Sequence, residues 1–360
     1  AYHALMKSSM AAGLHASTWG PDGKPEAANA HVLRAAKLHM AGEVEAGHLC
    51  PIVMTHAATA ALMARGMAES VRGTPTAALS ALVGAGVSTA CIVGKSWDFH
   101  VIEALRTTLD EGVAMVGDSV RYLRGRGMRV FFDAEHFFDG YKANPEYALR
   151  VVEAAATEGA EVVVLCDTNG GSLPHEVQRI TAEVHAYFGA DQQVGIHTQN
   201  DSGCAVGNSI AAVVAGATHL QGTVTGYGER TGNANLMTCI PNLELKMGVR
   251  CLPDGRLDRL TTVSRRVAEL VNLPPHGADP YVGAQAFAHK GGLHTSALGR
   301  AGGASYEHVD PTVVGNHTRV LVSDLGGRAG LTMKAREFGV DLDDHQAADL
   351  SEQLKALEAE

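Results

Sequence analysis

The chain has 360 residues, of which 46% are hydrophobic, and it carries a formal net charge of −10 with its histidines neutral. This acidity argues against a nucleic-acid surface and against a basic membrane patch. No apolar run is long enough to span a bilayer, and the N-terminus shows no signal-peptide pattern. The six cysteines are scattered without a Cys-x-x-Cys motif, which predicts reduced thiols in a cytoplasmic protein.

Residues 1–66 predict a helical N-terminal segment. A turn at residues 19–23 precedes a run with helical spacing of apolar side chains over residues 31–46. The histidines of this segment lack tight ligand spacing, and we interpret them as ordinary surface or core residues: His31, His39, His48 and His56.

From about residue 74 onward, strand-like runs alternate with helical patterns. The runs begin near Ala90, Arg129, Val162, Gln193 and His219, at intervals of 39, 33, 31 and 26 residues. Each interval has the length of one strand–helix unit, and a series of such units predicts a parallel sheet.

Each predicted strand ends in polar residues. In chain order, the five groups are Lys95; Asp133, Glu135 and His136; Asp167, Thr168 and Asn169; His197, Gln199 and Asn200; and Glu229, Arg230 and Asn233. Such gathering at the carboxyl ends of parallel strands is typical of a TIM (β/α) barrel active site. A doubly wound open sheet would place its ligand at the same edge. The barrel is favoured because no Gly-x-Gly-x-x-Gly follows a strand. Nearby helix N-termini would favour anionic substrates such as keto acids.

Helix signals separate and follow these strands. Asn144 is predicted to cap a helix that starts at Pro145, and Ser172 precedes a helix with Pro174 near its start. After about residue 248 the repeat stops. Asp258 is predicted to cap a helix through Val271, with apolar side chains at Leu260, Val263, Val267 and Leu270. The last residues predict an acidic, amphipathic terminal helix.

The stretch VGIHTQNDSG, residues 194–203, reads as a buried strand followed by a glycine-bearing turn. Strand alternation places His197 and Gln199 on one face, with Thr198 opposite. Two such side chains at a strand end could hold one metal ion. A strand end with a hydrogen-bonded histidine is the alternative, and the residues by themselves leave both interpretations open.

Several long motifs in order resemble one family, the citramalate synthase branch of the 2-isopropylmalate/homocitrate synthases. They are GKSWDFHVIEALRTTL, DAEHFFDGYKANPEYAL, VLCDTNGGSLPHEV, GIHTQNDSGCAVGNS, QGTVTGYGERTGNANL, AFAHKGGLHTSAL, and YEHVDP through VLVSDLGGR. The resemblance covers about residues 74–345. It implies a partial barrel domain over residues 67–250, a small α+β linker and dimerisation subdomain over 251–345, and a terminal helix over 346–360.

The resemblance also implies an activity. Members of the family condense acetyl-CoA with a 2-keto acid on a TIM barrel, using a divalent metal (Mg²⁺, Mn²⁺ or Zn²⁺), and they serve isoleucine or leucine biosynthesis. The metal polarises the keto acid, and a base removes a proton from the acetyl methyl group. Pyruvate, giving citramalate, is the favoured substrate here; 2-isopropylmalate synthesis is an alternative. A homodimer is the expected assembly.

Roles transfer by motif to single residues of this chain. The resemblance implies metal ligands at His197, Gln199 and Asn233, substrate-binding groups at Thr168, Asp167 and Arg230, and catalytic groups at Glu135, His294 and Tyr306. His294 would assist proton transfer in a neighbouring subunit's active site, with Tyr306 near it. From the residues alone, a strand-end salt bridge for Glu135 and an ion pair for Arg230 remain open.

Two departures from the family pattern weigh against full activity. The family motif His-Thr-His-Asn-Asp has Gln199 in place of its second histidine, and the opening motif Asp-Thr-Thr-Leu-Arg-Asp-Gly occurs nowhere in the chain. Residues 1–66 instead resemble a fragment of an acyl-CoA dehydrogenase, so we expect a fusion joined to an incomplete barrel. Three further hypotheses follow: a catalytically impaired scaffold or dimer partner, a related metal-dependent lyase, and a flavin-dependent dehydrogenase, of which the dehydrogenase is the least favoured.

Overall fold

A computed structural model of the chain describes residues 77–84, 86–322 and 327–358. The predictions on residues 1–66, including the helix and the four histidines, lie outside the described residues. The described residues divide into two compact units between Asn235 and Leu236, and each unit is presented by itself. The finer division expected at residues 67, 251 and 346 stays a prediction.

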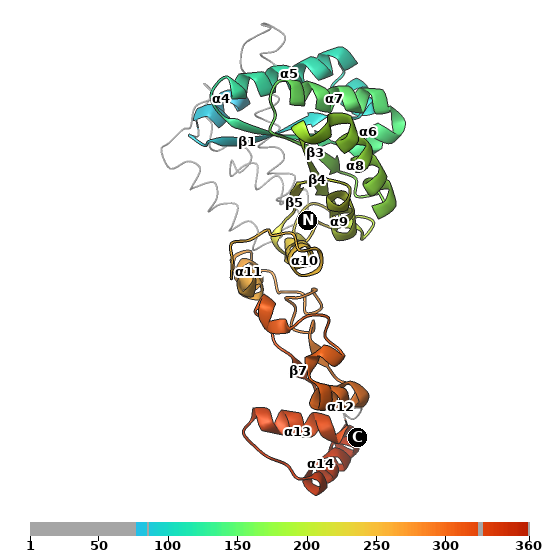
Figure 1. The fold of residues 1–360 in the computed structure, drawn as a ribbon, viewed down its shortest axis with the longest axis vertical. Coiled ribbons are helices and arrows are strands. Elements are labelled where there is room, and N and C mark those ends of the chain that lie inside the picture. The colour runs from blue at the N-terminus through green and yellow to red at the C-terminus, as the bar shows by residue number, and fades with distance from the viewer. Residues whose placement is uncertain (1–76, 85, 323–326, 359–360) are drawn as a thin grey trace, which may run out of the picture. The chain divides into compact units, whose positions relative to one another are not determined.

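The first unit, which we call unit 1, is a series of strands and helices around one parallel sheet (Figure 1). Its strands are β1 (Thr89–Lys95), β2 (Arg129–Glu135), β3 (Val162–Asp167), β4 (Gln193–Thr198) and β5 (His219–Gln221). Its α-helices are α4 (Ala77–Gly84), α5 (Leu109–Arg124), α6 (Phe137–Ala143), α7 (Pro145–Thr157), α8 (Pro174–Phe188) and α9 (Ala205–Val214). Short helices of other kinds are η2 (His100–Ala104), η3 (Gly189–Asp191) and η4 (Val224–Gly226).

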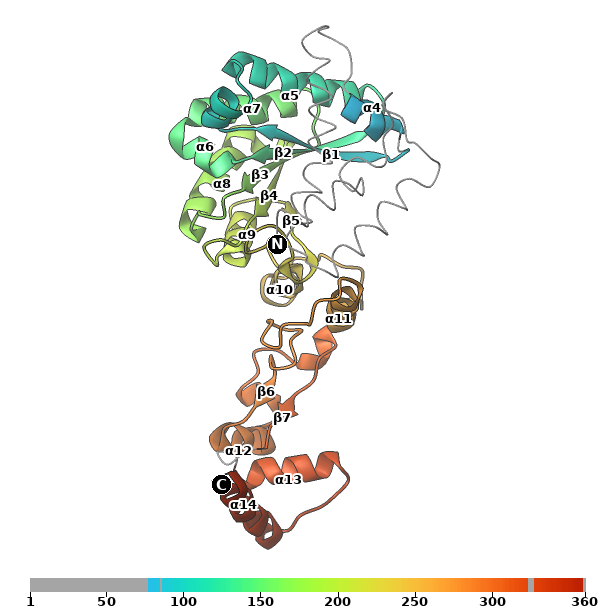
Figure 2. The same cartoon turned by 180° about the vertical axis from the view of Figure 1, so that it is seen from behind.

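The sheet has the order β1-β2-β3-β4-β5, and every neighbouring pair is parallel. The alternation of strands and helices predicted from the sequence is confirmed, with strand starts within one residue of the expected positions. One face of the sheet packs under the helices and forms the main core, which includes Val130, Phe132, Leu165 and Ile196. The helices α5, α6, α7 and α8 lie along this outer side in both ribbon views (Figures 1 and 2).

The opposite face of the sheet is concave, because side chains from distant strands meet across it. Gln221 of β5 donates from Nε2 to Oδ1 of Asp133 on β2 over 2.8 Å, and the ring of His219 on β5 lies 5.1 Å from that of Phe131 on β2. In a flat sheet with a strand spacing of about 4.8 Å, β2 and β5 would be about 14 Å apart. The sheet therefore curves around its inner face as a TIM-type barrel wall does.

Local capping explains where the helices begin. The Asn144 side chain accepts from the backbone N–H of Tyr147, and Pro145 is the first residue of α7, as predicted. Helix α8 also begins at its predicted proline, Pro174. Its capping contact comes from Glu176, which accepts from the backbone N–H of Leu173 over 2.9 Å. The polar atoms of Ser172 are used elsewhere, as described below.

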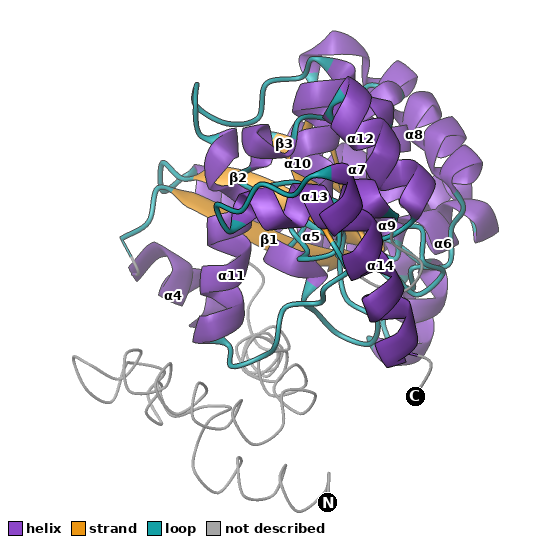
Figure 3. Ribbon diagram, turned by 90° about the horizontal axis from the view of Figure 1, so that it is seen from below, coloured by secondary structure: helices purple, strands orange, loops and turns teal. Residues whose placement is uncertain are grey.

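The second unit, unit 2, is mostly helical (Figure 3). Its α-helices are α10 (Leu236–Pro241), α11 (Leu260–Leu270), α12 (Gly292–Ala301), α13 (Arg328–Glu337) and α14 (Asp344–Glu358). Shorter helices are η5 (Asn242–Lys246), η6 (Leu257–Arg259), η7 (Gly303–Ser305) and η8 (Pro311–Val314). A parallel pair of short strands, β6 (Ala288–His289) and β7 (Arg319–Val320), completes it. The predicted terminal helix is confirmed as α14. The described residues include no helix long and apolar enough to cross a membrane.

The prediction for α11 was wrong in its cap and for two residues of its buried face, whereas Leu260 is buried as expected. Asp258 lies inside η6 and caps nothing, and Val263 and Leu270 are 42% and 52% exposed. The buried stripe of α11 instead contains Leu260, Thr261, Ser264 and Ala268. A polar contact lies on this buried side, where the Thr261 hydroxyl donates to the carbonyl oxygen of Val314 at the end of η8 over 2.7 Å.

Candidate active site

The carboxyl end of β4 orients two polar side chains toward the inner face of the sheet. Thr198 points the other way, is fully buried, and donates to the carbonyl oxygen of Ala205 over 2.9 Å. Because side chains alternate along a strand, His197 and Gln199 share the inner side. The isolated bridge of Gln199, directly after β4, supports the predicted placement of these two residues on one face, which stays a prediction.

A short antiparallel bridge brings Asn233 beside Gln199. The bonds from Asn200 N to Gly232 O (2.8 Å) and from Ala234 N to Thr198 O (3.0 Å) flank the bridged residues. Gln199 and Asn233 are thus a non-hydrogen-bonded pair, the arrangement in which opposed side chains lie closer together. The loop after β5 in this way returns Asn233 to the end of β4.

The side chain of Asn233 has little freedom. Its Nδ2 donates to the carbonyl oxygen of Tyr227 over 3.0 Å. A Cβ atom at Gly228 would lie 2.1 Å from that same Nδ2, so a side chain at 228 would displace the Asn233 amide. Asn233 therefore presents its Oδ1 in a fixed direction.

Two amide oxygens of this group are buried without a partner. Among the described residues, no donor makes a hydrogen bond to Oε1 of Gln199 or to Oδ1 of Asn233. Leaving such an oxygen unpaired costs about 1–3 kcal/mol, so buried oxygens of this kind are commonly met by a ligand, water or ion. Gln199 and Asn233, with the imidazole of His197, remain the predicted metal ligands, one nitrogen and two neutral oxygens.

This donor set fits a hard divalent cation. Mg²⁺ and Mn²⁺ accept amide oxygens, whereas Zn²⁺ favours imidazole and thiolate. The described residues contain no group of three or more His, Cys, Asp or Glu side chains that could hold a metal ion. A metal here would consequently depend on the oxygens of Gln199 and Asn233 as well as on His197.

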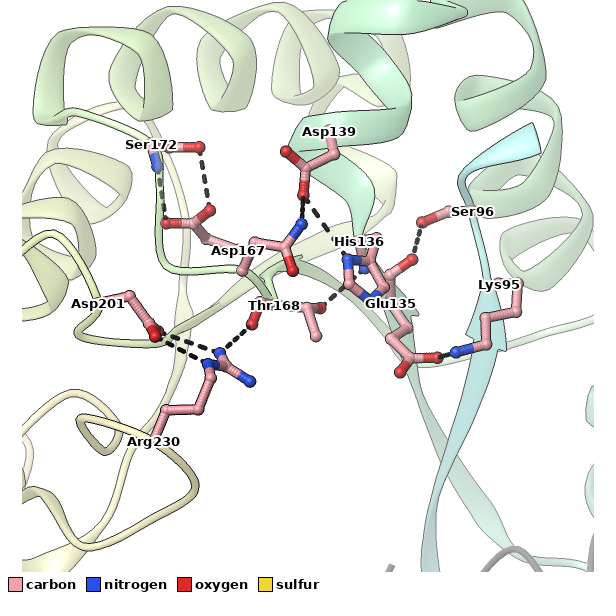
Figure 4. A network of polar contacts seen from close by, with 11 residues as sticks. Lys95, Ser96, Glu135, His136, Asp139, Asp167, Thr168, Ser172, Asp201 and Arg230 are labelled. Carbon is pink, nitrogen blue, oxygen red and sulfur yellow. Dashed lines mark hydrogen bonds and ion pairs between the residues drawn. The ribbon is translucent and has the colours of Figure 1, made fainter. Parts of the chain in front are cut away.

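Glu135 ends β2 on the same inner face and forms an ion pair with Lys95, its register partner at the end of β1 (Figure 4). The two side chains are 22% and 28% exposed, so the pair is accessible. The backbone carbonyl of Glu135 accepts from the Ser96 hydroxyl over 2.7 Å. The salt bridge that the sequence left open is thus present, and it places an ammonium group beside the carboxylate.

Thr168 follows β3 and connects two neighbouring loops (Figure 4). Its hydroxyl oxygen accepts from the backbone N–H of His136 over 2.8 Å, which leaves the hydroxyl proton free to be donated. Its carbonyl oxygen accepts from Nη2 of Arg230 over 2.6 Å.

Arg230 is occupied by protein groups. Its Nε and Nη2 donate to the two carboxylate oxygens of Asp201 over 2.7 and 3.0 Å. Donation from the guanidinium group lowers the pKa of Asp201 below its usual value. Arg230 therefore connects the loops that follow β3, β4 and β5, and the ion-pair alternative left open for it is present. Its expected role in substrate binding stays a prediction.

Asp167, expected from the resemblance to bind substrate, has protein partners on the outer side of the sheet, and its expected role stays a prediction. Its side chain points to the outer side of the sheet and is 1% exposed. Its carboxylate accepts from the Ser172 hydroxyl (3.0 Å), the Ser172 backbone N–H (3.3 Å) and Nδ2 of Asn208 (3.4 Å). Burial raises its pKa. Because strand alternation sends Asp167 away from the inner face, it joins β3 to α8 and α9 instead.

Unit 2 holds the remaining pair of predicted catalytic residues. The rings of His294 on α12 and Tyr306 after η7 stack with centroids 4.0 Å apart. Next to them, Nε2 of His289 lies 3.2 Å from Oε1 of Glu307, and the Thr318 hydroxyl donates to that same oxygen over 2.7 Å. The expected proximity of Tyr306 to His294 is confirmed, while their catalytic role stays a prediction.

Sequence reasoning missed one residue of the inner face. This residue is Gln221 on β5. Its Oε1 lies 2.9 Å from Nδ1 of His197, and its Nε2 donates to Asp133. Strand alternation from His219 would have placed Gln221 on the inner face, in register with His197, if the sequence had been examined for it.

A curved parallel sheet with helices outside and polar groups at its strand ends defines a (β/α)-barrel protein. The HMGL-like family matches residues 43–267, and the chain belongs to this family. A homocitrate synthase post-HMGL domain-like family matches residues 281–360, and the adaptive response protein AidB N-terminal domain family matches residues 1–76.

Named relatives agree with this membership. The chain is 55% identical over 264 residues to an (R)-citramalate synthase of Streptomyces coelicolor, covering 73% of this chain and 49% of the relative. It is 33% identical over 272 residues to a 2-isopropylmalate synthase of Sulfolobus acidocaldarius, covering 76% of this chain and 69% of the relative. A solved HMG-CoA lyase from Acenitobacter baumannii is 23% identical with a TM-score of 0.48, over 56% of this chain and 68% of that one. The chain spans about half the length of the citramalate synthase.

Proposed function

We propose that this chain forms part of an acyltransferase that condenses acetyl-CoA with a 2-keto acid, and that pyruvate is the keto acid. The overall reaction would convert acetyl-CoA, pyruvate and water into citramalate, free CoA and a proton, as a step toward isoleucine. The observation that carries the proposal is the pair of buried, unpartnered oxygens on Gln199 and Asn233, in a chain 55% identical to a citramalate synthase over 264 residues. The free thiols of the described cysteines favour the cytoplasm as the site of reaction.

A divalent cation held by His197, Gln199 and Asn233 would supply Lewis-acid polarisation of the keto carbonyl. The protein's own groups would orient the substrate around it. Thr168 has a hydroxyl proton to donate to the keto-acid carboxylate, since its oxygen already accepts from His136. The ammonium group of Lys95 would attract the same anionic substrate and hold the Glu135 side chain in place by their ion pair.

The proton chemistry needs a group that gives and takes protons near neutral pH, and His294 suits this role. Its stacking on Tyr306 fixes the plane of the imidazole and places a phenol hydroxyl nearby. We assign both residues to proton transfer, in an active site completed by a second copy of the chain as the family resemblance implies.

The identity values favour pyruvate over a longer keto acid. The (R)-citramalate synthases of Streptomyces coelicolor and Aquifex aeolicus are 55% and 51% identical to the chain, and the 2-isopropylmalate synthase of Sulfolobus acidocaldarius is 33% identical. We therefore prefer citramalate synthesis to 2-isopropylmalate synthesis.

One observation favours a second candidate, a scaffold without activity. Gln199 gives the metal site a neutral oxygen where the family resemblance implies an imidazole, and a neutral amide is a weaker ligand for transition metals. A protein of this kind would retain the fold and the subunit contacts and would release no CoA.

The test is release of free CoA from acetyl-CoA in the presence of Mn²⁺ or Mg²⁺, with pyruvate or 2-ketoisovalerate as acceptor. Release that requires both metal and pyruvate, and that exceeds release with 2-ketoisovalerate, is the expected result. Glu135→Gln should abolish it, while Glu153→Gln on the exposed side of α7 should not. Absence of release from folded protein would favour the scaffold.

A further inference from the structure

A chain of polar side chains crosses the inner face of the sheet from β2 to β4. Oδ1 of Asp133 on β2 accepts from Nε2 of Gln221 on β5 over 2.8 Å. Oε1 of the same Gln221 amide lies 2.9 Å from Nδ1 of His197 on β4. Gln221 and His197 are register partners in the β4–β5 pair, whereas Asp133 reaches Gln221 only because the sheet is curved.

This chain of contacts determines the direction of every hydrogen bond in it. A carboxylate can only accept, so the group that Gln221 turns toward Asp133 is its NH₂. Its carbonyl oxygen consequently faces His197, and an oxygen there requires a proton on Nδ1 of the imidazole. The other neighbour of Nε2 is Sγ of Cys91 at 3.8 Å. Burial raises the pKa of that thiol to about 12, so it is neutral and offers only a weak contact.

A neutral imidazole with its proton on Nδ1 has a lone pair on Nε2. That lone pair is the group through which histidine binds metals, and the hydrogen bond to the other nitrogen selects it. We propose that Gln221 is a positioning residue that holds His197 in the Nδ1–H tautomer, with Asp133 fixing the direction of the Gln221 amide. The inference deepens the proposed function, because it assigns a residue that prepares the metal ligand.

The tautomer can be observed without metal and without substrate. In protein labelled with ¹⁵N-histidine, two-bond ¹H–¹⁵N spectra at pH 8.5 distinguish Nδ1–H from Nε2–H rings, and His197→Asn identifies the His197 signals. The wild-type spectrum should show Nδ1–H. Gln221→Leu should release the ring to a mixture containing Nε2–H, and Asp133→Asn should do the same because an amide at 133 no longer fixes the orientation of Gln221. Gln193→Leu, an exposed change on the same strand as His197, should leave the spectrum unchanged.

A second readout is the affinity for Mn²⁺, measured by electron paramagnetic resonance. Gln221→Leu should lower it roughly 10- to 100-fold, the range typical of lost partners behind a metal ligand. An Nε2–H signal from wild-type His197, or unchanged Mn²⁺ affinity in Gln221→Leu, would overturn the proposal. A third outcome separates the two proposals: the Nδ1–H signal is present and depends on Gln221, but wild-type protein binds no Mn²⁺. In that case the role of Gln221 in fixing the His197 tautomer is supported, and the proposed metal-dependent function fails.

Discussion

At the ends of β3 and β4, the Asp167 carboxylate on the outer side and two amide oxygens on the inner side differ in their partners, although Oδ1 of Asn208 on the outer side also has none among the described residues. On the outer side, the buried carboxylate of Asp167 accepts from Ser172 and Asn208. On the inner side, the described residues offer no donor to Oε1 of Gln199 or Oδ1 of Asn233, although both oxygens are buried. Buried polar groups with hydrogen-bond partners stabilise the fold. Buried polar groups without partners lower stability, and they are expected where a ligand supplies the missing partner. Substitutions on the two sides should therefore separate stability from metal affinity.

The largest effect on stability should come from Asp167→Ala on the outer side. The change leaves the hydroxyl and the backbone N–H of Ser172 buried and unpaired, whereas Nδ2 of Asn208 keeps its bond to the Ser172 carbonyl. We expect the free energy of unfolding to fall by about 3 kcal/mol. Urea denaturation measures it, with the exposed Asp118→Ala on α5 as the matched control. A loss below about 0.5 kcal/mol would contradict the view that this network holds β3 to α8 and α9.

The next largest effect should come from unit 2 and concern activity alone. His294→Ala should lower CoA release about 100-fold, as removal of a proton-transfer group typically does. Because the proposed metal ligands are all in unit 1, Mn²⁺ affinity should stay unchanged. Tyr306→Phe keeps the ring that stacks on His294 and should have a smaller effect. Equal losses of Mn²⁺ affinity and activity in His294→Ala would refute this division of roles.

Gln199→His tests whether the inner side is otherwise assembled as a metal site. An imidazole in place of a neutral amide should raise Zn²⁺ affinity on the order of 100-fold, since one ligand of a structural zinc site accounts for about 3 kcal/mol. The gain for Mn²⁺ should be smaller. Competition with a chromophoric chelator measures both ions. An unchanged Zn²⁺ affinity would show that His197 and position 199 do not converge on one ion.

The smallest effect should come from a satisfied group near the surface, the Glu176 carboxylate at the start of α8. Its bond from the Leu173 N–H lowers its pKa, so its contribution is present above the usual glutamate pKa and is lost as the pH falls through the lowered value. Glu176→Gln should cost under about 1 kcal/mol at pH 7. In urea denaturation at successive pH values, the difference from wild type should shrink as the pH falls through that range. A difference that grew on acidification would have the wrong sign.

Much of unit 1 could be predicted because its signals are local. Apolar runs about 30 residues apart locate the strands, and alternation along β4 places His197 and Gln199 together. The partners of Asp167 could not be predicted in the same way, since Asn208 lies 41 residues further along the chain. The bond between Asp133 and Gln221 joins residues 88 positions apart and depends on the curvature of the sheet.

The sequence analysis was weakest where polar contacts outweigh hydrophobic spacing. In α11 the apolar pattern selected Val263 and Leu270, which are exposed, while Thr261 and Ser264 are buried and Thr261 donates to Val314. The Lys95–Glu135 ion pair remained one of two alternatives because strand register, which makes these residues partners, is not readable from either strand alone.

The most direct test of the central claim is a Mn²⁺ titration of wild-type protein, Gln199→Leu and Asn233→Ala, followed by electron paramagnetic resonance. If the two buried oxygens are metal ligands, wild-type protein should bind one Mn²⁺ ion, and each variant should lose at least roughly tenfold in affinity. Gln199→Leu should also be as stable as wild type or more stable, since it removes an unpaired buried oxygen. Wild-type affinity in both variants would contradict the account, and it would leave these oxygens as an unexplained cost of the fold.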